Sequence, residues 1–317
     1  MPWHWPTRRH AAHGSSGAAA VMAFLAHLEK VGLERAGPEL AAWHKATHTV
    51  DWPALGALAD DNPGIATRLL RLASTAPTGR IPPALNLAEA FKRLGPGRVF
   101  ETAAMTLTRK MFLEGEMAGG GEPGELWRHG VAAGILLRCL TDRMWGSSAL
   151  PPGEAFLLGL VHDLGLAAQC VVLGEESWRA VLEAWRGGPA TICVAESEQT
   201  GAAHPEIGAR ILQQWGIGPE VTDPVTLHHE LPMEKDAHGD LTYLLRMADW
   251  VCGREGLGFA DVGVSEGVAY RECQTFWELA PAEMRQAATD AATELAWLER
   301  LGLVSHLHLR LVFAPAA

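Results

Sequence analysis

Residues 155–173, AFLLGLVHDLGLAAQCVVL, indicate the fold class of this chain and contain two polar residues that an apolar helix does not explain. Apolar residues fill nearly every position, which is typical of a helix buried on all sides. His162 and Asp163 nevertheless stand side by side within this stretch. A buried carboxylate costs several kcal/mol unless it is paired with a positive charge or bound to a metal. The stretch therefore predicts a core helix, with partners for these two side chains elsewhere in the chain.

Helical periodicity continues along almost the whole chain. Ala and Leu dominate, runs rich in β-branched residues are nearly absent, and Gly or Pro interrupts the pattern at intervals suited to helices. Helices are expected over residues 64–75, 86–95, 97–114, 125–145, 153–173, 176–186, 205–216, 240–253 and 281–302. Residues 306–313, HLHLRLVF, alternate like a strand. The predicted fold class is all-α.

Two glycine-rich breaks indicate how the chain is organised, one at 118–124 (AGGGEPG) and one at 253–267. The beginning of the chain superficially resembles a signal peptide, but its apolar run is short and leads into charged residues, so an amphipathic helix is expected there. We expect four parts: a flexible tail over 1–17, an N-terminal helical subdomain over 18–118, a second helical subdomain over 123–258, and a C-terminal helical segment over 268–317.

Charge and cysteine usage exclude several classes of protein. The formal net charge of −11 argues against broad binding to nucleic acid or to an anionic membrane, because both need a basic face. No stretch approaches the ~18 uninterrupted apolar residues of a membrane span. The five cysteines form no C-x-x-C pair, which is typical of reduced thiols. We expect a cytoplasmic protein.

Further histidines and one aspartate lie where partners for His162 and Asp163 are expected. They occupy apolar helix stripes or the ends of predicted helices: His129, His204, His228, His229 and Asp249. Each alone is explained by a structural role, such as a hydrogen-bonded core histidine or a helix cap. Together they fit one cluster better than separate coincidences. Histidine nitrogens and carboxylate oxygens suit iron, manganese or zinc, and a bridging aspartate suits a site for two ions.

The ordered set His, His-Asp, His, His-His, Asp resembles the HD superfamily of metal-dependent phosphohydrolases. This resemblance implies an all-helical, HD-like bundle in which His162 and Asp163 are metal ligands, with Asp163 bridging if two ions bind. It further implies that His129 and Asp249 complete the first ion's site, and that the second ion's site uses His204, His228 and His229.

The surrounding motifs resemble one branch of that superfamily, the HD-related output domain (HDOD) family. They occur in the family's order: DNPGIATRLLRLAST (61–75), NLAEAFKRLG (86–95), LWRHGVAAGILL (126–137), AFLLGLVHDLG (155–165), HPEIGARILQQWGI (204–217) and the His-His pair. The resemblance covers roughly residues 48–258. It implies a bacterial signalling protein that acts as an output through contacts with a signalling protein partner.

Three departures from the resembling families bear on catalysis. Ser74 and Thr75 replace the usual Asn-Ser of HDOD proteins, a minor change. Leu166 stands where active cyclic-dinucleotide phosphodiesterases of the superfamily place a lysine, which would meet substrate phosphate as a point charge. Residues 231–241, LPMEKDAHGDL, lack the Gly-Tyr-Pro signature of that branch. Hydrolysis of cyclic di-GMP is therefore not expected.

Three functions remain open from the sequence. The preferred hypothesis is a regulatory output protein. The alternative is an active metal-dependent phosphohydrolase, either a phosphodiesterase or a nucleotide phosphatase. A weaker hypothesis is a metal or nucleotide sensor without turnover. A nucleotide or phosphate ligand could be held by arginines near the motifs, Arg128, Arg210 and Arg246, although a surface salt bridge is the favoured explanation for each one.

Overall fold

The computed structural model describes residues 14–76, 79–80, 82–120, 124–143, 150–187, 191–230, 239–257 and 280–304. Helices make up nearly all of this part of the chain, so the all-α prediction is confirmed. Within it, the sheet content is one antiparallel pair of two-residue strands, β1 (Thr75–Ala76) and β2 (Gly79–Arg80). The predicted strand over 306–313, residues 1–13 of the predicted tail, and residues 268–279 and 305–317 of the predicted C-terminal segment lie outside the described residues.

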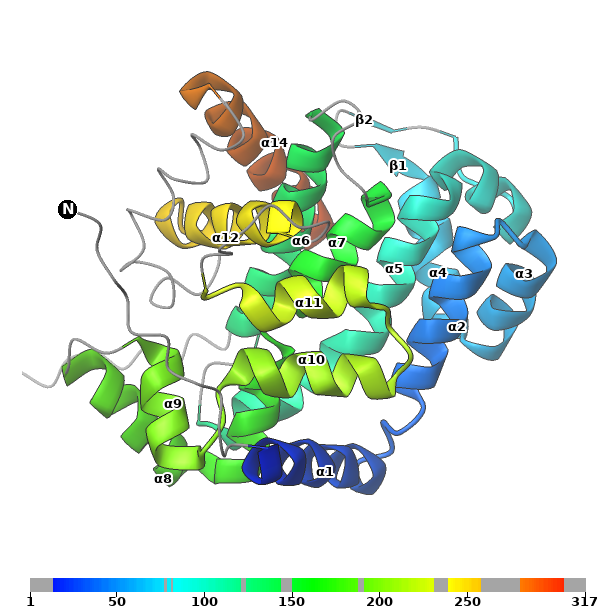
Figure 1. Cartoon of the computed structure of the whole chain (residues 1–317). Helices are drawn as coiled ribbons and strands as arrows, with labels where there is room; N and C mark the ends of the chain where they lie inside the picture. The colour runs from blue at the N-terminus through cyan, green and yellow to red at the C-terminus, as the bar shows by residue number, and fades with distance from the viewer. Residues whose placement is uncertain are drawn as a thin grey trace, which may run out of the picture.

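The first part of the chain forms five helices: α1 (Gly14–Lys30), α2 (Ala36–His48), α3 (Trp52–Asp61), α4 (Pro63–Ala73) and α5 (Leu87–Ala118). Capping side chains set two of the helix starts, because Asp51 accepts from the Ala54 N–H at 3.0 Å and Asn62 from the Ile65 N–H at 3.2 Å. Helices α2, α3 and α4 pack on α5, whereas α1 lies across one end of the molecule and contacts α8 and α10 (Figure 1).

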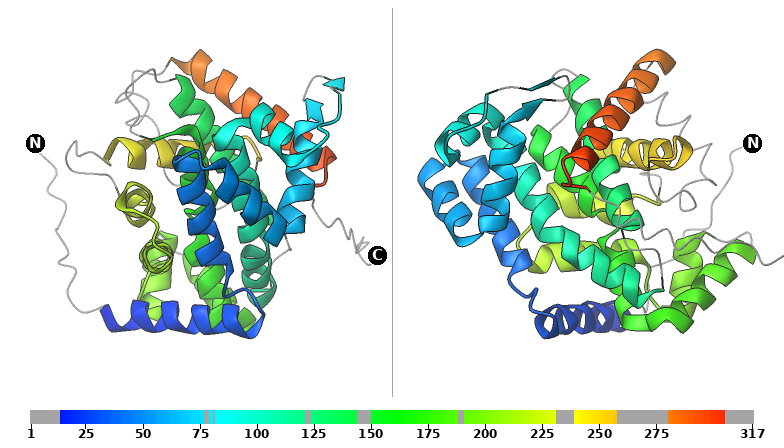
Figure 2. Two further views of the ribbon diagram at one scale, coloured as in Figure 1. Left: turned by 90° about the vertical axis from the view of Figure 1, so that its right-hand side faces the viewer. Right: turned by 180° about the vertical axis from the view of Figure 1, so that it is seen from behind.

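The second part contains the helices that build the interior and the C-terminal helix: α6 (Glu125–Arg143), α7 (Pro152–Val161), α8 (Leu164–Gly187), α9 (Ile192–Thr200), α10 (His204–Gln214), α11 (Pro219–Leu227), α12 (Gly239–Arg254) and α14 (Pro281–Arg300). Helices α10, α11 and α12 lie one above another on one face, in front of α6 and α7 (Figure 1). Seen from behind, α14 crosses α6 (Figure 2), held there by ion pairs from Arg138 to Glu294 at 2.6 Å and from Arg128 to Glu299 at 2.7 Å.

Helix boundaries differ from the sequence expectation at one place and agree with it at two glycines. The predicted helix over 153–173 is broken, because α7 ends at Val161 and α8 begins at Leu164, leaving His162 and Asp163 in the break. The predicted boundary between the helices over 86–95 and 97–114 agrees with the structure, because α5 consists of two helical segments that meet at a kink at Gly95, φ 72°. Similarly, α8 runs through Gly174 at φ 70°. Glycine tolerates this left-handed conformation, so each chain segment can change direction without a connecting loop.

One hydrophobic core joins buried residues from α1 to α14. Residues 14–17, which the sequence analysis assigns to the tail, belong to α1. The predicted division of the chain between 118 and 123 stays a prediction. Residues 153–184 include an 18-residue window that is apolar enough to span a membrane by length and composition, but 83% of that window is buried inside the protein. Its apolar surface is therefore used for internal packing.

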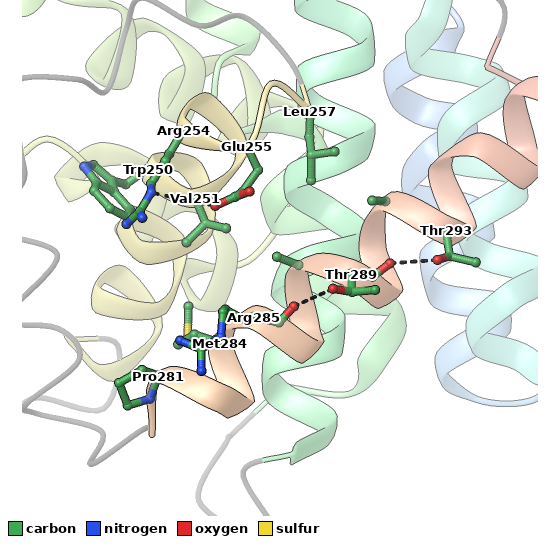
Figure 3. A pocket seen from close by; sticks show the side chains of 12 residues that line it. Trp250, Val251, Arg254, Glu255, Leu257, Pro281, Met284, Arg285, Thr289 and Thr293 are labelled. Carbon is green, nitrogen blue, oxygen red and sulfur yellow. Dashed lines mark hydrogen bonds and ion pairs between the residues drawn. The ribbon is translucent and has the colours of Figure 1, made fainter.

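A groove separates α12 from the N-terminal half of α14 (Figure 3). Its volume is about 740 Å³. Trp250 and Arg254 line the α12 side, with the Arg254 guanidinium carbon 5.2 Å from the centroid of the Trp250 ring, and Met284 and Arg285 line the α14 side. The cluster residues predicted from the sequence lie elsewhere, in the interior of the bundle.

Close helix packing in that interior depends on glycines. A Cβ atom added at Gly134 of α6 would lie 2.6 Å from the Phe156 carbonyl oxygen, and one at Gly159 of α7 would lie 2.6 Å from the Ala133 carbonyl carbon. At the start of α8, a Cβ on Gly165 would lie 1.9 Å from the His204 carbonyl oxygen. Backbone therefore meets backbone at these crossings, and no side chain larger than hydrogen fits without moving a helix.

Replacement of Gly165 by alanine should therefore destabilise the protein. We expect a loss of about 1–3 kcal/mol or more in the free energy of unfolding, because the new methyl group meets backbone atoms that cannot rotate away. Gly56→Ala is the matched control, since no atom lies within 4 Å of its added Cβ and alanine stabilises a helix interior by about 1 kcal/mol relative to glycine. Urea denaturation measures both variants. Equal stability of Gly165→Ala and wild type would contradict the proposed backbone contact.

Candidate metal centre

Six helices bring the predicted residues together in the interior. His129 lies on α6, His162 caps the C-terminus of α7, and Asp163 precedes the first residue of α8. His204 is the first residue of α10, His228 and His229 follow α11, and Asp249 lies on α12. Six of these seven side chains belong to buried residues, and His229 is partly buried. The sequence-based expectation that they converge agrees with this arrangement; their role as metal ligands stays a prediction.

The two carboxylate oxygens of Asp163 face different pairs of histidines. Asp163 Oδ2 lies 3.3 Å from His162 Nε2 and 3.6 Å from His129 Nε2. Asp163 Oδ1 lies 3.5 Å from His204 Nε2 and 3.6 Å from His228 Nε2. One carboxylate therefore has histidine nitrogens on both sides, as a bridging ligand between two ions would.

Asp249 and His229 complete the two groups. Asp249 Oδ1 lies 3.0 Å from His129 Nε2 and 3.8 Å from His162 Nε2, so it joins the Oδ2 group. The His229 ring lies 4.2 Å, centroid to centroid, from the ring of His228 and 5.0 Å from that of His204. Ligand atoms of Asp163, His204, His228 and His229 all lie within 4.8 Å of one another. The same holds for His129, His162 and Asp163.

Hydrogen bonds behind the rings fix which nitrogen faces the cluster. His162 Nδ1 is 2.8 Å from the Gly159 carbonyl oxygen, and His228 Nδ1 is 2.7 Å from the Val225 carbonyl oxygen. A carbonyl oxygen only accepts, so both Nδ1 atoms carry the hydrogen. In the neutral ring the lone pair then lies on Nε2, which points into the cluster. This is the usual way a protein orients a metal-binding histidine.

The spacing within the cluster suits an ion better than hydrogen bonds. The N–O distances of 3.3–3.6 Å around Asp163 exceed the 2.7–3.2 Å of ordinary N–H···O bonds. Neither Asp163 oxygen has a hydrogen-bond partner of acceptable geometry among the described residues. Two ligands of one ion at about 2.1 Å lie ~3.0–3.4 Å apart for octahedral to tetrahedral angles. The 3.3 Å separations of His162 Nε2 from Asp163 Oδ2 and of His204 Nε2 from His228 Nε2 fall in this range, and the other three N–O distances around Asp163, 3.5–3.6 Å, lie slightly above it. The donor set therefore fits one or two divalent ions.

Electrostatics keep the carboxylates ionised and some histidines neutral. Burial by itself would raise the pKa of Asp163, but the charge of His162 and the surrounding imidazoles hold that pKa well below its usual range. Burial likewise opposes ionisation of Asp249, but His129 and His162 lower its pKa. For His228, burial first and then the neighbouring His229 lower the pKa to about 3. His228 is therefore a neutral imidazole beside ionised carboxylates, which is the protonation state in which a histidine binds a metal.

Glu196 on α9, which was not predicted from the sequence, contacts the cluster through His204. Its carboxylate, fully buried, accepts from the His204 backbone N–H at 2.9 Å and lies 2.8 Å from His204 Nδ1. Burial lowers the pKa of His204, but Glu196 and Asp163 outweigh it and raise the value to about 9. A sequence signal was present, because Glu196 follows Ile192 by one helical turn on the apolar stripe of α9.

The three arginines differ in their surroundings. Arg246 is buried and its Nη1 donates to the His228 carbonyl oxygen at 3.1 Å, so it contacts the cluster. Arg128 pairs with Glu299 of α14, and Arg210 pairs with Glu206 one turn earlier on α10, at 2.6 Å. The salt-bridge explanation thus applies to Arg128 and Arg210. Phosphate binding by any of the three stays a prediction.

A protein family and a curated relative match this chain. The family model of the HDOD domain matches residues 46–231, more than half of the 317 residues. A protein of Treponema pallidum (strain Nichols), described as uncharacterized, is 25% identical over 194 residues, which cover 61% of this chain and 36% of that protein. The chain therefore spans about a third of the length of that curated relative.

Solved structures share the fold. A candidate signal transduction protein from Marinobacter aquaeolei VT8 has a TM-score of 0.66 at 17% identity, covering 94% of this chain and 66% of that one. A candidate metal-dependent phosphohydrolase from Shewanella amazonensis SB2B has a TM-score of 0.56 at 19% identity, covering 89% of this chain and 99% of that one. At these identities the likeness extends to the fold alone.

Metal binding should be visible in thermal stability. If the ion binds the folded chain only, its removal by a chelator should lower the melting temperature, since binding stabilises by mass action. Asp163→Ala should abolish that difference, whereas the exposed Asp60→Ala should keep it. Differential scanning calorimetry with and without chelator makes the comparison. Identical curves for wild-type protein known to carry metal would contradict a site coupled to folding.

Loss of the Glu196 carboxylate should weaken the metal site without removing a ligand. Glu196→Gln should reduce metal affinity about 10–100-fold, the usual effect of losing a group that orients a ligand. Glu198→Gln on the same helix is the control, because Glu198 is exposed. Competition with a chelator of known affinity measures both variants. An unchanged affinity for Glu196→Gln would show that His204 needs no such support.

Proposed function

This chain belongs to the HDOD family, and on that basis we propose that it is a bacterial signal-transduction output protein with a His/Asp metal site. It acts mainly by binding, through a signalling protein partner or through a nucleotide or phosphate ligand. The fold it shares with a candidate signal transduction protein supports this assignment. A cytoplasmic location is part of the proposal, supported by burial of most of the 18-residue apolar window within residues 153–184.

The observation that carries the proposal is the side chain at position 166. Leu166 is 3% exposed and packs in the hydrophobic core, three residues after Asp163. Catalysis of phosphoryl transfer depends mainly on positioned charge around the phosphate. Leucine supplies no charge at the position where a lysine would meet phosphate. The donor set for a metal is thus complete while this cationic contact is missing, which favours a binding role over turnover.

The residues present define where ions would bind. One ion would be held by His129, His162, Asp163 and Asp249. A second would be held by Asp163, His204, His228 and His229. Iron, manganese and zinc all accept such mixed imidazole and carboxylate ligands. Because these residues lie on or beside six helices, a bound ion would stabilise the point where the helices meet, and with it the surface that a partner contacts.

An active phosphohydrolase is the second candidate, and one observation favours it. The two oxygens of Asp163 face separate histidine pairs, an arrangement suited to two ions. Such ions would lower the pKa of a bound water and neutralise charge on a phosphoryl group. Arg246 contacts the cluster and could hold a phosphate oxygen. A phosphodiester or a nucleotide would then be the substrate.

Turnover and partner binding distinguish the two candidates. We expect wild-type protein loaded with Mn²⁺, Fe²⁺ or Zn²⁺ to hydrolyse cyclic di-GMP and p-nitrophenyl phosphodiesters far more slowly than ~1 per second. A folded His162→Ala, Asp163→Ala variant is the control. Partner recovery from the producing cell should be similar for both proteins. Hydrolysis at ordinary enzyme rates by wild type alone would establish the phosphohydrolase instead.

A further inference from the structure

A second group of metal-binding residue types lies between α2 and α7. His44 and His48 project from the last turns of α2, and Glu154 lies in the first turn of α7. Glu154 Oε1 is 3.1 Å from His44 Nε2 and 3.2 Å from His48 Nδ1. We call these three residues the α2–α7 cluster. None of them belongs to the sets of residues that the HD resemblance implies as ligands.

The backbone presents the two histidines together. His44 and His48 are four residues apart in HKATH, so they lie on one face of α2, one turn apart. This i, i+4 spacing is the one by which two helical histidines share a zinc ion. The His44 ring packs against Phe100 at a centroid distance of 5.3 Å, which limits its rotation. The His48 side chain is 63% exposed, so its ring has room to reorient.

The carboxylate is well placed to be the third ligand. The Glu154 side chain is 10% exposed, and within the described part of the chain its ion pairs are with these two histidines. Hydrogen bonding by His44 lowers the pKa of Glu154 despite its burial, so the carboxylate is ionised at neutral pH. No lysine or arginine among the described residues pairs with it. A divalent cation would satisfy this charge together with both imidazoles.

The distances suit one ion, with one adjustment. Both N–O separations, 3.1 and 3.2 Å, match the ~3.0–3.4 Å expected between two ligands of a common ion. The ring centroids of His44 and His48 are 6.2 Å apart, so the exposed His48 ring must turn towards His44 to bring the third ligand pair into range. Two histidines and one glutamate also form the ligand set of several zinc enzymes, with a fourth position left to water.

We propose that His44, His48 and Glu154 bind a late first-row transition-metal ion, such as Zn²⁺, at a site separate from the central cluster. Glu154 precedes Asp163 by nine residues, most of them in α7, which places the two sites about 12–14 Å apart along the helix. The ion would link α2 to α7, whose C-cap residue is His162. The α2–α7 cluster then ties the N-terminal helices to the central site.

Zinc stoichiometry tests this proposal on the full chain. Metal-free wild type should bind one more Zn²⁺ per chain than His48→Ala, as measured by isothermal titration calorimetry, because the variant removes an exposed ligand without disturbing the core. Glu154→Gln should lose the same equivalent. His27→Ala is the matched control, since His27 forms a comparable pair with Glu114 at 3.5 Å but no second histidine among the described residues pairs with that carboxylate. It should bind zinc as wild type does.

Two further measurements distinguish zinc bound at the α2–α7 cluster from zinc bound at the central cluster. Asp163→Asn should lose zinc at the central cluster and retain the equivalent that His48→Ala lacks. Co²⁺ should give visible absorption from the α2–α7 cluster in Asp163→Asn, and this absorption should disappear when His48→Ala is added. Equal zinc stoichiometry and affinity in wild type and His48→Ala would overturn the proposal. So would a cobalt spectrum of Asp163→Asn that the His48 substitution leaves unchanged.

Discussion

The structure depends on how the buried carboxylate of Asp163 is stabilised. Its side chain is 2% exposed, and removing a carboxylate from water costs several kcal/mol unless the surroundings compensate. Compensation comes from histidines of four helical elements, which approach both oxygens. The N-termini of α8 and α10 also begin at the cluster, and their positive dipole ends favour a negative charge there. The helices must therefore meet at this one point.

Glycines make that meeting possible. The crossing of α6 and α7 at Gly134 and Gly159 sets the distance between His129 and His162, whose ring centroids lie 5.2 Å apart. The contact of Gly165 with the His204 backbone sets the other side of the cluster. Around this interior, α14 adds a layer outside the family match, fixed to α6 by paired charges. The positions of the polar side chains at the centre thus depend on close backbone packing around them.

The sequence predicted the helical fold and the seven cluster residues, because both depend on local patterns. Apolar periodicity identifies a buried helix face, and a His or Asp on that face stands out. The sequence did not predict that the helix breaks at His162 and Asp163, since a continuous apolar run gives no sign that a helix ends. Glu196 and Glu154 were missed for a different reason. Their partners, His204 and His44, come from other helices, so only the packing of those helices reveals the contacts.

The central claim is that Asp163 lies between metal ions rather than among hydrogen-bonded imidazoles. Anomalous X-ray diffraction from crystals of protein purified without chelator tests it most directly. If Asp163 binds metal, an anomalous peak should lie about 2.0–2.2 Å from one Asp163 oxygen and from the Nε2 atoms of the histidines on that side. If two ions bind, a second peak should lie beside the other Asp163 oxygen. Crystals without a peak at Asp163 from protein supplied with Mn²⁺ or Zn²⁺, with histidine N–H groups donating to both oxygens, would contradict it.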